Sequence, residues 1–230
     1  MNTLHSTVTT ASIFKEILDI FFPMLCLGCQ SASNEPYCQS CIPYIRKLQN
    51  PYCAVCSEPF LSETTDSLCQ QCKEVSPPFE KVFSFFLYGG LLQETIARWK
   101  FTPSLGLSSQ IKKLLTAEII TIRNQLSELD VIVPVPMHRK AFMKRGFHQT
   151  LMLAKTVSQQ LKIPLVLALK KKLFTASQSG LTSKQRKQNL FKSFSLSSKN
   201  EKFIQQKHIG LIDDVFTTGA TARECSRLLI

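Results

Sequence analysis

Cysteine spacing is the feature that most constrains this chain. Eight of its nine cysteines fall in four pairs of the form Cys-x-x-Cys. Such a pair makes a tight turn that directs two thiolates at one ion, and two turns complete a tetrahedral site. We therefore predict two structural zinc ions, since four thiolates leave no coordination position open for chemistry. The eight predicted ligands are Cys26, Cys29, Cys38, Cys41, Cys53, Cys56, Cys69 and Cys72.

Spacing alone leaves open which pairs share an ion. Sequential pairing gives one site to the first four ligands and the other to the last four, and it closes the shorter loops. A cross-braced arrangement is the alternative. Disulfides are disfavoured, because the N-terminal stretch lacks a secretory cleavage signal and disulfides are rare in the cytosol. The ninth cysteine, Cys225, lies in a predicted helix and is expected to pack in the core.

Composition and patterning divide the chain into three regions. Apolar residues make up 44% of the 230, which is enough to build a core. No apolar run approaches the roughly 20 residues that a bilayer crossing needs, so we expect no membrane span and a cytoplasmic location. We expect an N-terminal helix or tail over 1–22, a double zinc ribbon over 23–76 and a larger domain over 77–230.

The charge of the chain is strongly positive and unevenly spread. The formal net charge is +12. From Val131 to Asn200 there is no Asp or Glu, against 14 Lys or Arg. A solvated surface usually mixes both signs, whereas a surface that holds phosphates does not. This span therefore predicts an anionic ligand, such as a phosphorylated small molecule or a nucleic acid.

The larger domain alternates strand-like and helix-like segments. Apolar runs predict strands at 81–90, within 129–140, at 163–169 and at 207–215. Helical spacing predicts helices at 92–101, about 107–126, 146–162 and 220–229. This alternation predicts the α/β fold class, with a mostly parallel sheet flanked by helices.

The stretch "LIDDVFTTGAT", residues 211–221, is the strongest candidate for a ligand site. Asp213 and Asp214 follow a predicted strand, and ligands of parallel sheets bind at the carboxyl ends of strands. The turn "TTGAT" then leads into the last helix, whose free amides and nearby hydroxyls suit a phosphate. A ribose phosphate fits both halves, because its hydroxyls complement the acid pair.

These residues carry a specific resemblance. "IGLIDDVFTTGAT" resembles the motif that binds phosphoribosyl pyrophosphate (PRPP) in type I phosphoribosyltransferases. From about residue 14 to its end, the chain resembles the ComF family, the competence-protein-F proteins with a double zinc ribbon and a phosphoribosyltransferase-like domain. The segments that carry this wider resemblance are "YGG…WKF", "VPVPMHRKAFMKRGFHQ" and "SQSGLTSKQRKQNL".

The resemblance implies a role for particular residues. Asp213 and Asp214 would be the catalytic acids, holding the ribose hydroxyls of PRPP, which these enzymes use as its magnesium complex. Arg139 and Lys140 would lie near the pyrophosphate, and Arg145 would close over the site with Lys184 and Arg186. The 5′-phosphate would bind at Thr217, Thr218, Gly219, Ala220 and Thr221.

Two departures from the family pattern accompany the resemblance. His148 stands where the family usually has Asn, and we assign it no role. The sequence stops at Ile230, about one helix after the acid motif, where similar proteins continue through a further strand. We expect this early stop to affect the side of the site that receives the acceptor base rather than the phosphate cradle.

Two functions from different classes follow. The first is a phosphoribosyltransferase that binds PRPP, acts on an unidentified acceptor and serves DNA uptake. The second is a non-catalytic adaptor for single-stranded DNA that retains the same fold, with a helicase-like competence partner. Lys170, Lys171 and Lys172 follow a predicted strand, and we expect them to lie outside the phosphate cradle, on a separate DNA groove.

Overall fold

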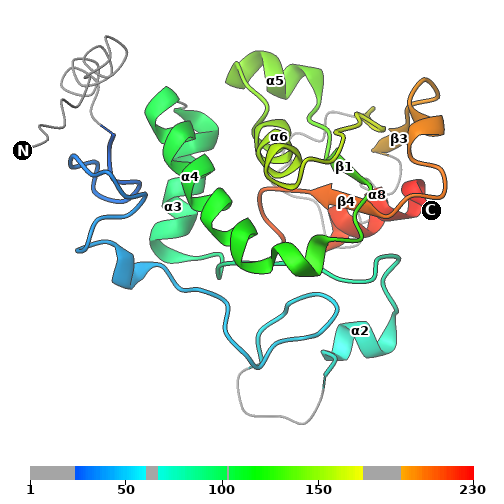
Figure 1. Cartoon of the computed structure of the whole chain (residues 1–230), viewed down its shortest axis with the longest axis horizontal. Coiled ribbons are helices and arrows are strands. Elements are labelled where there is room, and N and C mark those ends of the chain that lie inside the picture. The colour runs from blue at the N-terminus through cyan, green and yellow to red at the C-terminus, as the bar shows by residue number, and fades with distance from the viewer. Residues whose placement is uncertain (1–23, 61–66, 103, 173–192) are drawn as a thin grey trace, which may run out of the picture.

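The computed structural model describes residues 24–60, 67–102, 104–172 and 193–230 (Figure 1). The predicted N-terminal helix and the segment with Lys184 and Arg186 lie outside these ranges. The helices are α2 (Gln70–Glu74), α3 (Gly90–Phe101), α4 (Leu105–Ile122), α5 (Arg139–Arg145), α6 (Gln149–Leu161) and α8 (Ala220–Leu229). The strands are β1 (Val131–Pro134), β2 (Leu169–Lys171), β3 (Phe194–Leu196) and β4 (Ile209–Ile212). Short 3-10 turns lie at Ile42–Tyr44, Arg123–Leu126 and Glu201–Phe203.

A parallel pair of strands forms the centre of the larger domain. β1 and β4 pair in register from Val131 opposite Ile209 to Pro134 opposite Ile212. A parallel bridge from Leu165 to Ile132 continues the sheet on the other side of β1. β2 and β3 form a separate antiparallel pair. The fold class is therefore α/β with a parallel sheet, as predicted from the alternation of segments.

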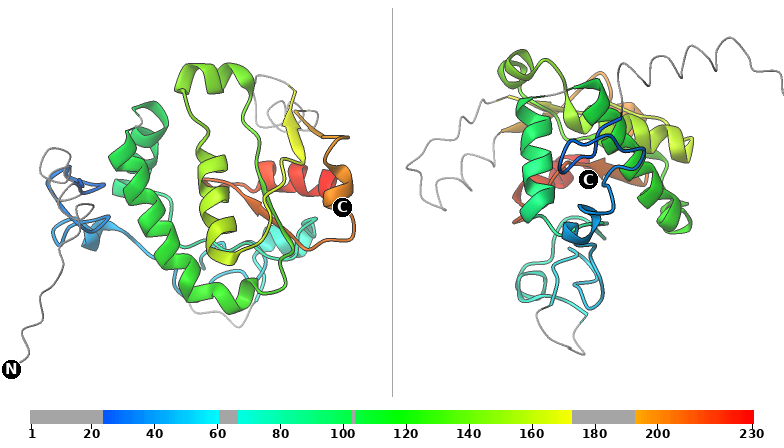
Figure 2. Two further views of the ribbon diagram at one scale, coloured as in Figure 1. Left: turned by 45° about the horizontal axis from the view of Figure 1, so that its top comes forward. Right: turned by 90° about the vertical axis from the view of Figure 1, so that its left-hand side faces the viewer.

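Helices cover both faces of this sheet, because successive side chains of a strand point to opposite faces. Ile132 packs in one cluster with Ile119 of α4 and Val157 of α6. Val131 and Val133 pack in another cluster, which contains Cys225 of α8. Cys225 is fully buried there, as predicted. Figure 2 shows the sheet between α6 and α8.

Two predicted strands differ from the structure. Segment 81–90 forms no strand, because its backbone contacts the cysteine-rich region instead of the sheet. The Leu48 amide donates to the Phe85 carbonyl at 2.9 Å, and the Leu87 amide donates to the Arg46 carbonyl at the same distance. Segment 163–169 supplies only the bridge at Leu165 before β2 begins.

Among the described residues, both parts of the cysteine-rich region contact the larger domain. Its first part, blue in Figure 1, lies beside α3 and α4, and its second part, cyan, lies below the sheet. No helix in the described ranges combines the length and the apolar character needed to cross a bilayer.

Candidate functional site

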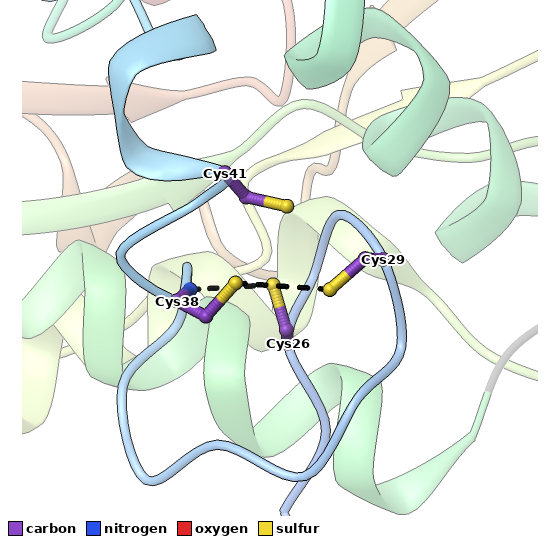
Figure 3. A group of neighbouring side chains, drawn as sticks. All are labelled: Cys26, Cys29, Cys38 and Cys41. Atoms are coloured by element: carbon purple, nitrogen blue, oxygen red, sulfur yellow. Dashed lines mark hydrogen bonds between the residues drawn. The ribbon is translucent and has the colours of Figure 1, made fainter.

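The first four cysteines converge on one point (Figure 3). The sulfur atoms of Cys26, Cys29, Cys38 and Cys41 all lie within 4.8 Å of one another. Those of Cys29 and Cys38 are 3.7 Å apart. Tetrahedral zinc with bonds of about 2.3 Å places two thiolates about 3.8 Å apart, so the donor set fits a structural zinc ion.

The last four cysteines form an equivalent site. The sulfur atoms of Cys53, Cys56, Cys69 and Cys72 also lie within 4.8 Å of one another. Those of Cys56 and Cys69 are 3.5 Å apart. The sequential assignment is therefore confirmed, and the cross-braced alternative is wrong.

The acid pair lies at the carboxyl end of β4. The backbone amide of Asp214 donates to the Asp213 carboxylate at 2.9 Å, which fixes the two side chains relative to each other. Lys100, the penultimate residue of α3, forms an ion pair with Asp214 at 2.7 Å. Both side chains are mostly buried, with 22% and 13% of their surfaces exposed, so water screens the pair only in part.

Two further titratable groups, Lys171 and His148, lie close to the acid pair. Lys171 of β2 interacts electrostatically with Asp213, and Arg145 at the end of α5 interacts with Lys171. His148, just before α6, interacts with Asp214. The expectation that Lys171 lies on a groove separate from the acid pair is therefore wrong. β2 turns this lysine inward, whereas Lys170 and Lys172 are exposed.

Burial and charge set the protonation of this cluster. Burial, followed by repulsion from Asp214, raises the pKa of Asp213 to about 7. Lys100 and Lys171 partly oppose that rise. Burial lowers the pKa of Lys171, and attraction to Asp213 opposes the change. Asp213 therefore titrates close to neutral pH, so the charge of the cluster depends on pH in this range.

The loop after the acid pair reaches the start of α8 through Gly219. Gly219 has φ of +69°, in the left-handed region that favours glycine. A Cβ there would lie 2.7 Å from the ring of Phe216, so the position is closed to larger residues. Thr217 and Thr218 are exposed, and no side chain caps the first turn of α8. The start of this helix thus presents amides and hydroxyls to a ligand.

The predicted pyrophosphate loop lies between β1 and α5. Arg139 and Lys140 occupy the first turn of α5 and are exposed. The Met137 amide in this loop donates to Nε2 of His148 at 3.0 Å, and the Leu151 amide lies 3.2 Å from Nδ1. A neutral imidazole has one unprotonated nitrogen, so it accepts one of these bonds at a time. His148 thus links the loop to α6.

Three residues of this site, Lys100, Lys171 and His148, were not predicted from the sequence. Lys100 belongs to a helix more than a hundred residues before the acid pair, and only the fold joins them. Lys171 was assigned to another surface, and His148 was given no role. Lys100 directly follows Trp99, which is fully buried, but no local pattern points from Lys100 to Asp214.

Comparison with known proteins identifies relatives over most of the chain. Residues 17–73 match the double zinc ribbon domain. Competence protein F of Haemophilus influenzae is 31% identical over 216 residues, which cover 91% of this chain and 92% of that protein. DNA utilization protein YhgH of Escherichia coli is 30% identical and covers 77% of this chain and 83% of its own length. Competence protein ComFC of Bacillus subtilis is 25% identical, over 86% of this chain and 79% of that protein.

Proposed function

The chain belongs to the ComF family of competence proteins, and we propose that it binds PRPP at the acid pair and serves the handling of DNA. The relatives support the DNA setting, because they are named for competence or for DNA utilization. The single observation that carries PRPP binding is the convergence of the Asp213–Asp214 pair with Lys100 and Lys171 beside an uncapped helix start.

Each half of PRPP has a counterpart in this arrangement. Adjacent carboxylates accept hydrogen bonds from the ribose hydroxyls, and bonds to charged groups are about twice as strong as neutral ones. The 5′-phosphate would bind at residues 217–221, where amides of the first turn of α8 are free. The pyrophosphate would lie against Arg139 and Lys140. Hard carboxylate oxygens suit Mg²⁺, which would neutralise part of the ligand's charge.

Lys100 has a specific part in this proposal. In the free protein its ammonium group neutralises Asp214. Ribose hydroxyls or Mg²⁺ would replace that contact and release the ammonium next to a polyanionic ligand. The site would therefore exchange one ion pair for another instead of burying an unpaired charge, which would be costly.

Transfer follows if an acceptor reaches the ribose. The bond from C1 to the pyrophosphate oxygen breaks, and a bond from C1 to the acceptor forms while the acceptor's proton passes to water. Cationic side chains that hold the departing pyrophosphate stabilise the charge that develops on it. Arg139, Lys140 and Arg145 are the candidates for this role. The acceptor is the part of the reaction that a screen must identify.

The test is calorimetric titration with PRPP in the presence and absence of Mg²⁺. Changing Asp213 and Asp214 together to Asn removes charge-assisted hydrogen bonds worth roughly 1.5–3 kcal/mol each, so affinity should fall by at least a hundredfold. Asp130→Asn is a matched control, because Asp130 precedes β1 and pairs with Lys207 at the opposite end of the sheet. Equal PRPP affinity in the double variant and the wild type would refute the proposal. A screen for pyrophosphate release across free bases then tests transfer.

One surface favours single-stranded nucleic acid as a second candidate ligand. α5 has no buried residue and carries four basic residues in its seven positions. Phe142 and Met143 on this helix are 42% and 72% exposed. Phe101 is 70% exposed and lies 5.7 Å beneath the Arg145 guanidinium. Exposed rings among cations are the usual platform for stacked bases beside a phosphate chain.

Anisotropy titration with a single-stranded oligonucleotide tests this surface. Binding through phosphates predicts a salt slope of about −0.7 per contact, which Lys144→Gln should reduce. Phe101→Ala and Phe142→Ala should weaken oligonucleotide binding, because each removes a ring on which a base would stack. Lys202 and Phe203 supply the matched controls away from α5, because Lys202 Nζ lies 5.1 Å from the centre of the exposed Phe203 ring. The control substitutions are Lys202→Gln and Phe203→Ala. Equal effects at both pairs would exclude α5 as the DNA surface, and complete displacement by PRPP would place both ligands in one pocket.

A further inference from the structure

The second four-cysteine site contacts the loop between β4 and α8. Phe216 in this loop packs against the buried cluster of Cys53, Cys56 and Cys72. Its ring also meets Phe79 edge-on, with centroids 6.3 Å apart and 83° between the ring planes. The residue directly before the candidate phosphate-binding residues 217–221 therefore uses its side chain to contact the second ribbon.

Arg223 adds a second link from the first turn of α8. Its guanidinium lies 5.9 Å from the centre of the Phe79 ring. It also donates to the Val75 carbonyl at 3.3 Å, just beyond the last cysteine of the ribbon. The loop, through Phe216, and α8, through Arg223, thus both contact the segment 75–79.

The Phe216 ring also packs against Gly219 of the phosphate loop. It fills the space directly over Gly219, where an added Cβ would lie 2.7 Å from the ring carbon. Gly219 in turn accepts from the Arg223 amide at 2.8 Å, which is the first hydrogen bond of α8. Displacement of the ring would therefore free the glycine and the first turn of the helix together.

We propose that the ribbon of residues 53–72 is a positioning element for the loop at 215–221, acting through Phe216. Metal binding at the second four-cysteine site then favours the loop conformation that presents the helix amides. Its effect on phosphate affinity rests on the function proposed above. Coupling between two sites is reciprocal, so a phosphate bound at the loop must strengthen metal binding at the ribbon by the same factor.

The first experiment measures loop order without any ligand. Amide hydrogen exchange of residues 215–223 is compared between zinc-loaded wild type, Cys69→Ser and Cys29→Ser. Both variants lose one cysteine ligand, but only Cys69 belongs to the ribbon that contacts Phe216. We expect exchange about tenfold faster in Cys69→Ser and unchanged in Cys29→Ser, as for a local opening that one site controls. Equal exchange in the two variants would overturn the proposal.

The second experiment keeps both zinc sites intact and alters the ring. Phe216→Ala should lower affinity for ribose 5-phosphate about tenfold, within the usual range of coupling between sites. Affinity for inorganic pyrophosphate, which would bind at the β1–α5 loop, should stay unchanged. Phe216→Leu retains apolar contact with the ribbon and should recover part of the loss. A parallel fall in both affinities would mean general destabilisation and would contradict the positioning role.

A matched control and a reciprocal measurement complete the test. Phe86→Ala removes a partly buried ring that packs against the first ribbon, and it should leave ribose 5-phosphate affinity unchanged. Ribose 5-phosphate should slow zinc release from the second site of the wild type to a chelator. If wild type binds neither PRPP nor ribose 5-phosphate, the proposed function fails, while the exchange comparison still decides whether the ribbon orders the loop.

Discussion

The two four-cysteine sites have the same ligand spacing but different neighbours. The first shares a hydrophobic core with the helices, in which Leu27 and Tyr37 pack with Trp99 of α3 and Ile111 of α4. Polar contacts add to it, since Thr95 donates to the Leu27 carbonyl at 3.1 Å and Arg98 donates to the same atom. The second packs mainly on itself and contacts the larger domain through Phe216, Arg223 and Val82. Ser57 Oγ donates to the Val82 carbonyl at 2.6 Å, and the Val82 amide donates to the Val55 carbonyl at 2.7 Å.

Because of this difference, each ribbon contacts a different segment next to the acid pair. The first ribbon packs on α3, the helix that supplies Lys100 to Asp214. The second contacts the loop that follows the same acid pair. A metal site merged with a core contributes to global stability, whereas one that contacts a loop contributes to local order. We expect the ribbons to differ in what fails when each is lost.

Loss of a zinc site should have the largest effect. Cys26 and Cys53 are the first cysteines of the two sites, and both are almost fully buried. Cys26→Ser and Cys53→Ser are therefore a matched pair of variants. Each variant should contain one zinc ion instead of two by elemental analysis. Because folding and metal binding are coupled, with apparent energies of about 10–16 kcal/mol in zinc fingers, each ribbon should unfold locally. Calorimetry should show a lower main unfolding temperature in Cys26→Ser and an unchanged one in Cys53→Ser.

Opposite outcomes would break the comparison. If Cys53→Ser also lowers the main transition, the second ribbon is part of the core. If neither variant does so, the shared core around Trp99 adds little to the stability of the larger domain. Zinc content below one ion per chain in either variant would show that the sites bind metal cooperatively, which their separate positions do not predict.

Ring removal at the two interfaces should have the next largest effect. Trp99 is fully buried in the first interface, and Trp99→Ala should cost about 3–5 kcal/mol of unfolding free energy. Phe79 is partly exposed in the second, and Phe79→Ala should cost about 0.5–1.5 kcal/mol, the usual value of an aromatic pair. Urea denaturation measures both. Similar costs would mean that the second interface is as tightly packed as the first.

Sequence patterns predicted those parts of the molecule that are set by residues close together in the sequence. Cysteine spacing identified all eight cysteines of the two four-cysteine sites, and the order of strand, acids, turn and helix at 207–229 matches β4 and α8. Contacts across the chain were not predictable in this way. Nothing near Lys100 indicates Asp214, and nothing near Phe216 indicates a zinc ribbon. The apolar run at 81–90 was interpreted as a strand because periodicity does not say which surface an apolar face covers.

A glycine substitution in the loop of the second interface should show a smaller effect than the loss of Trp99. Gly219→Ala places a Cβ in the left-handed region, at a cost of about 1–2 kcal/mol. Contact with Phe216 adds to that cost. Gly106→Ala is the matched control, because a Cβ there meets nothing within 4 Å and alanine favours the α4 helix by about 0.5–1 kcal/mol. Thermal unfolding should therefore move in opposite directions. A neutral Gly219→Ala would mean that the ring moves aside easily.

The smallest expected effect is on the pH dependence of PRPP binding. Substitutions next to the first ribbon and next to the second should change this dependence differently. The raised pKa of Asp213, about 7, means that its carboxylate is mostly ionised only above that pH. A ligand that needs the carboxylate should therefore bind about tenfold more tightly at pH 8 than at pH 6. Lys100 lowers the pKa of Asp213, so Lys100→Met should move the midpoint of PRPP binding to higher pH.

The second ribbon should leave that midpoint unchanged, because Phe216 adds no charge near Asp213. Phe216→Leu should thus weaken binding equally at every pH, while Asp213→Asn should remove the Asp213-dependent part of the profile. PRPP's own phosphates titrate identically with all variants, so differences between profiles belong to the protein. A shift of the midpoint in Phe216→Leu would mean that loop order controls the burial of Asp213, and the two ribbons would then act on one property of the site.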